Sequence, residues 1–221
     1  MTIVADAAFC AIAALFGYQG IRWYLAREEL EGEGRSFAQL SSKKYMYFLA
    51  VFSACAIWIV FFETRYALPL LSQMRLLGLL LLLFPCAVVD GFAKKIPNRF
   101  LVVGLIVWSV FFGIELILQR ETAMSSIVDS LTGATILGAF FLLMRLLFKN
   151  SIGVGDIKLL MMIGLYQGLQ GAMSSIFFSM FALFLTSVFL LLTKRKERKD
   201  TLPFCPSVLV GTILSVAMTG M

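Results

Sequence analysis

Repeated apolar runs of about 20 residues constrain the fold of this chain more than any other feature. A bilayer core is crossed by roughly 20 helical residues. Of the 221 residues, 60% are hydrophobic and only 14% are charged, too few to cover a soluble surface with charge. We therefore expect an all-α polytopic membrane protein with about eight transmembrane helices. The candidate spans are residues 3–20, 45–62, 68–90, 100–118, 126–148, 157–169, 172–192 and 206–221.

The basic residues predict how these spans are oriented. Lys and Arg are retained on the cytoplasmic side of short loops, and here they concentrate in the connections that follow the first, third, fifth and seventh runs. This alternation places both termini outside and makes the basic loops short and cytoplasmic. It also accounts for the net charge of +6. We therefore expect membrane lipids as partners and no nucleic acid.

The residue types present restrict the chemistry that is possible. The chain has no histidine, and its four cysteines are scattered singly without a Cys-x-x-Cys pair. Histidine-based zinc sites, Ser/His and Cys/His nucleophile pairs and dithiol redox sites are thereby excluded. We expect no metal, no cofactor and no disulfide, so acid–base chemistry has to come from carboxylates, Lys, Tyr or Cys.

Two aspartates lie at the predicted cytoplasmic edge of the membrane. Asp90 ends one apolar run and Asp156 opens another. Each has a structural interpretation: Asp156 accepts free N–H groups at a helix start, and Asp90 simply ends a span. Gly153 and Gly155 permit a tight turn and close packing beside Asp156. If the third and sixth spans pack together, the two carboxyls meet, as in an aspartic protease that activates water.

At these residues the chain resembles the type IV prepilin peptidases, which are GxGD-type membrane aspartic proteases. Gly153-Val154-Gly155-Asp156-Ile157-Lys158 fits the family's G-x-G-D-x-K, and Asp90 with Ile96-Pro97-Asn98 fits the motif of the first aspartate. Leu202-Pro203-Phe204-Cys205-Pro206 looks like the proline-bearing segment before the last span of the family.

The resemblance implies a function and a set of site residues. Asp90 and Asp156 would be the catalytic pair of an endopeptidase that removes a short basic leader from pilin-like precursors. Cleavage would take place at the cytoplasmic face of the inner (cytoplasmic) membrane. Gly153, Gly155, Lys158, Pro97 and Asn98 would bind substrate or support the motifs; headgroup anchoring explains Lys158 equally well.

One segment departs from the larger members of that family. Those members carry a cytoplasmic domain with paired Cys-x-x-Cys motifs and also N-methylate the new terminus, whereas loop 22–44 is short and has no cysteine. We therefore expect residues 1–221 to form a single membrane peptidase domain with no zinc and no methyltransferase activity. This compact form is similar to the peptidase-only members, including those of tight-adherence pilus systems, and to preflagellin peptidases.

Three other classes of function stay open on the sequence alone, and one of them is a purely structural membrane subunit. A presenilin-like intramembrane protease shares Gly-x-Gly-Asp, and a small transporter also uses paired carboxylates and a glycine-broken helix. The proton roles are open as well. Helix dipoles favour Asp156 as the base, whereas Lys94 and Lys95 stabilise charge on Asp90.

Overall fold

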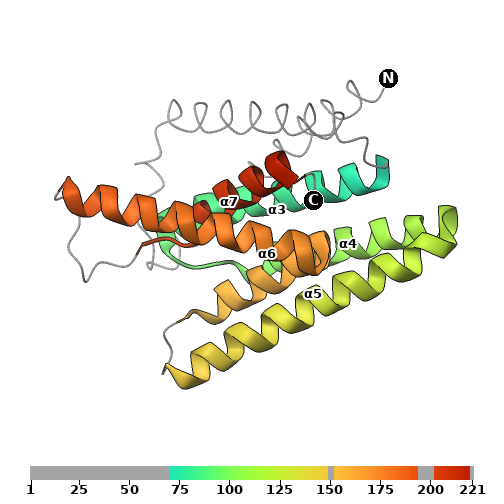
Figure 1. The fold of residues 1–221 in the computed structure, drawn as a ribbon, viewed down its shortest axis with the longest axis horizontal. Coiled ribbons are helices and arrows are strands. Elements are labelled where there is room, and N and C mark those ends of the chain that lie inside the picture. The colour runs from blue at the N-terminus through green and yellow to red at the C-terminus, as the bar shows by residue number, and fades with distance from the viewer. Residues whose placement is uncertain (1–69, 149–151, 194–201, 220–221) are drawn as a thin grey trace.

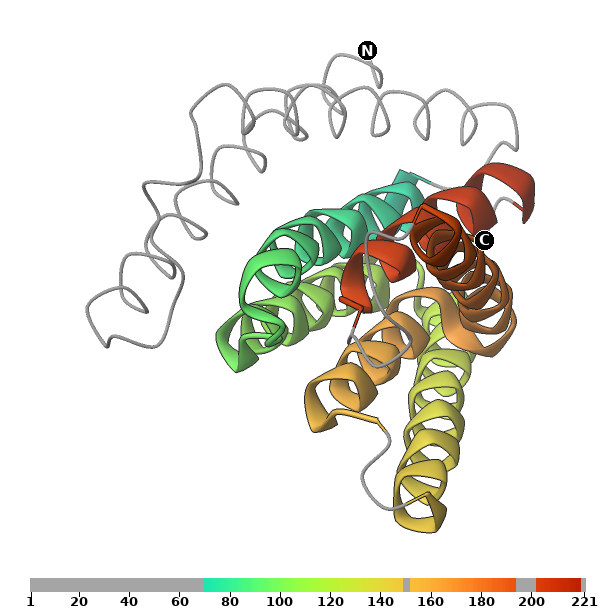
Figure 2. The same cartoon turned by 90° about the vertical axis from the view of Figure 1, so that its left-hand side faces the viewer.

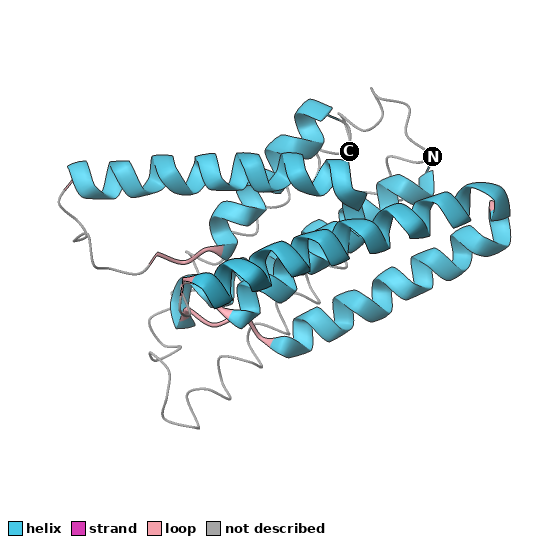
Figure 3. Ribbon diagram, turned by 60° about the horizontal axis from the view of Figure 1, so that its bottom comes forward, coloured by secondary structure: helices cyan, strands magenta, loops and turns pink. Residues whose placement is uncertain are grey.

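The chain folds into a bundle of apolar helices. The structure, a computed structural model, describes residues 70–148, 152–193 and 202–219. Every regular element in this part of the chain is helical: α3 (Leu70–Ala93), α4 (Asn98–Leu118), α5 (Arg120–Leu147), α6 (Val154–Leu192) and α7 (Cys205–Thr219) (Figures 1 and 3).

Four of these helices are long and apolar enough to cross a membrane. They contain the segments Leu71–Gly91, Asn98–Leu118, Ala123–Leu147 and Val154–Leu192, and the apolar helix Cys205–Thr219 is shorter. The predicted all-helical, membrane-type fold is therefore confirmed for the described residues. The spans predicted at 3–20 and 45–62, the loop 22–44 and the positions of the termini lie outside them, so the count of eight remains a prediction.

Helix α6 is interrupted at Gly168. This residue has φ 70° and ψ −173°, a left-handed φ that glycine adopts without steric cost. Figures 1 and 2 show the chain turning back there, so that the two parts of α6 run in opposite directions. The break therefore falls at Gly168, inside the predicted sixth run (157–169) and two residues before the gap between the sixth and seventh runs. The part before it, residues 154–167, is about 21 Å long, which is shorter than a bilayer core.

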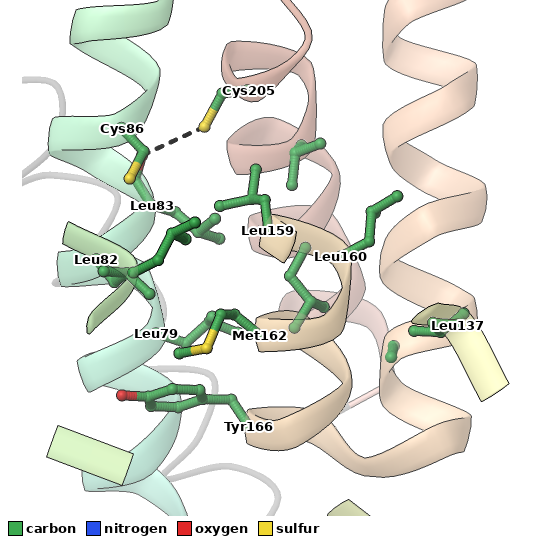
Figure 4. Close-up of a cluster of buried hydrophobic side chains, with 14 of the residues drawn as sticks. Leu79, Leu82, Leu83, Cys86, Leu137, Leu159, Leu160, Met162, Tyr166 and Cys205 are labelled. Atoms are coloured by element: carbon green, nitrogen blue, oxygen red, sulfur yellow. Dashed lines mark hydrogen bonds between the residues drawn. The ribbon is translucent and has the colours of Figure 1, made fainter. Parts of the chain in front are cut away.

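The core lies between α3 and the first part of α6. Leu79, Leu83 and Cys86 on α3 face Leu159 and Tyr166 on α6, and all five are fully or almost fully buried (Figure 4). A membrane interior offers polar groups no water, and two aromatic donors in this core bond to backbone carbonyls on a neighbouring helix. The Tyr166 hydroxyl donates to the Gly104 carbonyl at 2.7 Å and the Trp108 indole to the Leu165 carbonyl at 2.8 Å.

Glycines bring α5 and α6 into backbone contact. A Cβ on Gly164 would lie 2.6 Å from the Ala134 backbone nitrogen, and one on Gly133 would lie 2.8 Å from the Gly168 carbonyl carbon. Such close approach by small residues is typical of membrane helix interfaces. The two helices pack closely, and the start of α6 lies at the same end of the bundle as the end of α3 (Figure 1).

Candidate active site

An open cavity of about 840 Å³ lies at the end of the bundle where α3 ends and α4, α6 and α7 begin. Both sequence-predicted aspartates line it, together with all five predicted supporting residues. Its lining consists of Asp90, Lys94, Lys95, Ile96, Pro97, Asn98, Arg99, Gly153, Val154, Gly155, Asp156, Lys158, Leu202 and Phe204. The structure therefore brings together the two motifs, which are distant in sequence.

Asp90 is held by the start of another helix. It lies in the last turn of α3, is 5% exposed, and its Oδ2 accepts a hydrogen bond from the Cys205 backbone N–H at 2.8 Å. The first N–H groups of a helix have no partner within that helix. The Phe204 carbonyl accepts bonds from the N–H groups of Ser207 and Val208, which makes Phe204 the N-cap residue of α7. Phe204 has no side-chain acceptor, so Asp90 caps α7 from outside.

Asp156 lies in the first turn of α6, in the third position after the N-cap Gly153. Its half-buried carboxylate folds back toward Gly153, as the acidic residue of a capping box does, although glycine has no side chain for the reciprocal bond. A Cβ on Gly153 would lie 2.9 Å from Asp156 Oδ2. The first glycine of the motif therefore leaves room for the carboxylate to fold back over the helix end.

The second glycine has a different role. A Cβ on Gly155 would lie 3.2 Å from the Ile96 Cβ, which is tight for a packed core. Gly155 therefore lets the first turn of α6 pack directly against the loop between α3 and α4. Arg145, in the last turn of α5, donates to the Ile152 carbonyl and holds the segment just before the motif.

Lys158 joins the two motifs. Its Nζ donates to the Asn98 Oδ1 at 2.9 Å, which ties the first part of α6 to the start of α4. Pro97 is buried and is the N-cap residue of α4, with φ −70° and ψ 122°. The helix itself therefore begins at Asn98, directly after the proline. The contact with Asn98 was not foreseen from the sequence, because only the fold brings these two side chains together.

The cavity holds two acidic side chains, Asp90 and Asp156. Four cationic side chains line the same cavity, on Lys94, Lys95, Arg99 and Lys158. Two carboxylates in direct contact share a proton more readily than they both ionise, and such a pair is suited to acid–base chemistry on water.

Several residues of the cavity had no role in the sequence prediction. Leu202, Phe204 and the Cys205 amide come from the proline-bearing segment, for which the sequence indicated a resemblance and no function. A backbone N–H has no signature of its own, so only the proline pattern could have identified this segment. Within the described residues no three cysteine, aspartate or glutamate side chains cluster as metal ligands would.

The fold and the cavity define a class: a helical membrane protein with a two-carboxylate centre at one end of its bundle. Residues 77–191 match the type IV leader peptidase family, and the chain belongs to that family. It is also 31% identical over 135 residues to the prepilin leader peptidase/N-methyltransferase of Bacillus subtilis (strain 168), covering 61% of this chain. The chain spans about half the length of that curated relative (51%). No solved structure is significantly similar to it.

Proposed function

We propose that this protein is a membrane aspartic endopeptidase that removes the short basic leader from type IV pilin-like precursors. The observation that carries the proposal is that Asp90 and Asp156 line one open cavity in a member of the leader peptidase family. Cleavage would take place at the cytoplasmic face of the inner membrane, where the basic loops of the sequence would orient the cavity. Family membership favours this function over a presenilin-like protease or a transporter.

The proposed mechanism uses a water molecule between the carboxylates. The ionised aspartate takes a proton from the water while the water oxygen attacks the carbon of the scissile carbonyl. The protonated aspartate donates its proton to the carbonyl oxygen at the same time. When the tetrahedral species collapses, the C–N bond breaks and the aspartate that took the proton from water passes it to the leaving amine. A hydroxyl of the tetrahedral species returns a proton to the other aspartate. The products are a leader with a free carboxylate and a mature chain with a new amino terminus.

Helix dipoles do not decide which aspartate is the base. Asp156 lies at the start of α6, as expected, but Asp90 faces the start of α7 although it lies at the end of α3. Both carboxylates therefore experience the positive end of a helix. The dipole argument that favoured Asp156 is cancelled, and the base is to be assigned from activity measurements.

The four cationic side chains of the cavity affect how the leader would bind. Four cations surround two carboxylates, so the cavity does not attract positive charge. We expect the basic residues of the leader to lie toward solvent and its uncharged residues around the scissile bond to enter the cavity.

Three variants test the proposal. Asp90→Asn and Asp156→Asn should each lower cleavage of a pilin precursor by about 10²- to 10⁴-fold, because each removes one partner in proton transfer. Glu121→Gln makes the same acid-to-amide change on the exposed first turn of α5 and should retain activity. The new N-terminus is scored by mass spectrometry, with folding checked by thermal melting in detergent. Residual cleavage near wild-type rates in either aspartate variant would refute the proposal.

A further inference from the structure

A second hollow lies between the later part of α6 and the start of α7. Its volume is about 310 Å³, at the lower end of the range of about 300–1,000 Å³ for binding pockets. We call it the α6–α7 groove; it is lined by Ala182, Leu183, Thr186, Leu190, Leu202, Pro203, Pro206, Ser207 and Val210.

The groove adjoins the candidate active site. Leu202 lines both the groove and the two-aspartate cavity. Pro203 and Pro206 face the groove, while Phe204 lines the cavity and the Cys205 N–H holds Asp90. A single stretch of five residues therefore forms the boundary between the two hollows. A ligand that passes Leu202 would extend from one into the other.

The two hollows differ in chemistry. The cavity is ringed by charged side chains, whereas the groove is lined by apolar side chains apart from Thr186 and Ser207. The Thr186 hydroxyl donates to the Ala182 carbonyl of its own helix at 2.8 Å, and Ser207 is buried. The cavity and the groove together therefore suit a polypeptide with a polar segment in the cavity and an adjoining apolar segment in the groove.

We propose that the α6–α7 groove binds the apolar segment of the substrate that adjoins the scissile bond, while the bond itself lies between Asp90 and Asp156. This inference rests on the proposed function and adds a substrate-binding site to it. The groove lies within apolar helices, where lipid chains compete with any apolar partner, so binding depends on close van der Waals packing. Small side chains such as Ala182 and Ser207 allow that approach.

Filling the groove should separate binding of the apolar segment from chemistry. Val210 lines the groove and is 47% exposed; Leu214, one turn further along α7, is 40% exposed and is not among the lining residues. Val210→Trp should raise KM for a full precursor by at least about fivefold with kcat little changed, because it removes uniform binding. Leu214→Trp is the matched control. Neither variant should affect a short peptide that spans the cleavage site and lacks the apolar segment.

Photo-crosslinking tests the contact without requiring activity. In an Asp156→Asn background, a benzoylphenylalanine at Thr186 should crosslink to the apolar segment of the precursor. The same group at Phe184, which is 61% exposed and outside the groove lining, should crosslink to lipid.

Each negative outcome has a distinct meaning. Equal KM values for the Val210 and Leu214 variants, or lipid crosslinks alone at both positions, would refute the groove proposal and leave the peptidase intact. A wild-type protein that cleaves neither the precursor nor the short peptide would refute the proposed function, and the groove proposal with it.

Discussion

The Cys205 amide provides a sharp test of how Asp90 is held. Proline at position 205 removes the N–H that donates to Asp90 Oδ2 at 2.8 Å. It should be tolerated by the helix, because position 205 is the first residue of α7 and proline is favoured at that position. Cys205→Ala is the matched control, since it removes the buried thiol and keeps the N–H.

The size of the effect follows from the bond that is lost. A hydrogen bond to a charged group contributes about 1.5–3 kcal/mol, and each 1.4 kcal/mol corresponds to about tenfold. If the amide fixes the working orientation of Asp90, Cys205→Pro should lower kcat by about 10- to 150-fold relative to Cys205→Ala. KM should change little, because the variant leaves the other residues of the cavity in place.

The assay is the initial rate of precursor cleavage in proteoliposomes over a range of substrate concentrations. Thermal melting of both variants in detergent checks that the proline has not unfolded the start of α7. Equal kcat values for two variants that melt at the same temperature would refute the positioning argument. A loss confined to KM would also contradict it, since that result would assign the amide to substrate binding.

Three further predictions concern other contacts. Lys158→Met, which removes the bond to Asn98, should lower kcat/KM by about three- to tenfold, with Lys158→Arg restoring part of it in the same cleavage assay. Glu115→Ala should destabilise the protein by about 1–3 kcal/mol in a denaturation assay, because Glu115 accepts from Ser126 and pairs with Arg75 at 3.7 Å; cleavage by the folded protein should persist. The new N-terminus should carry no methyl group when cleavage is run with a methyl donor; a methylated product, detected by mass spectrometry, would contradict the expected peptidase-only activity.

The helical class and the pair of aspartates could be predicted because both depend on local pattern. Apolar runs of membrane length identify helices without any knowledge of their neighbours. Asp90 and Asp156 were distinguished by their position at the ends of such runs beside glycine and proline. The close packing that Gly155 allows against Ile96 agrees with the expected reason for a glycine at that position.

The contacts between distant residues could not be predicted in this way. Arg75 on α3 and Glu115 on α4 pair in the structure, and nothing in the local sequence of either residue indicates the other as its partner. Asp129 lies within α5, and its Oδ1 accepts the Leu169 N–H of α6 at 3.2 Å. In each case the individual residue is unremarkable, and the interaction depends on which helices become neighbours.

The turn at Gly168 connects the fold to the site. Replacing Gly168 should destabilise the fold by a predictable amount. A Cβ at position 168 would lie 1.8 Å from Asp129 Oδ2, and the φ of 70° is unfavourable for any side chain. Strain of this kind costs about 1–3 kcal/mol before the clash is counted. Gly168→Ala should therefore lower the melting temperature. It should also lower cleavage, because the later part of α6 has to run back toward the site for α7 to reach Asp90.

Gly113→Ala is the control for that substitution. Gly113 lies within α4 with nothing within 4 Å of an added Cβ, so alanine should be neutral or stabilise the helix by about 0.5–1 kcal/mol. An Asp129→Ala change in the Gly168→Ala background relieves the clash but leaves the backbone strain and removes the acceptor of the Leu169 N–H, so it should recover only part of the lost stability. Full recovery would show that the clash alone matters. No loss in Gly168→Ala itself would mean that the chain does not need a left-handed residue to reverse at this point.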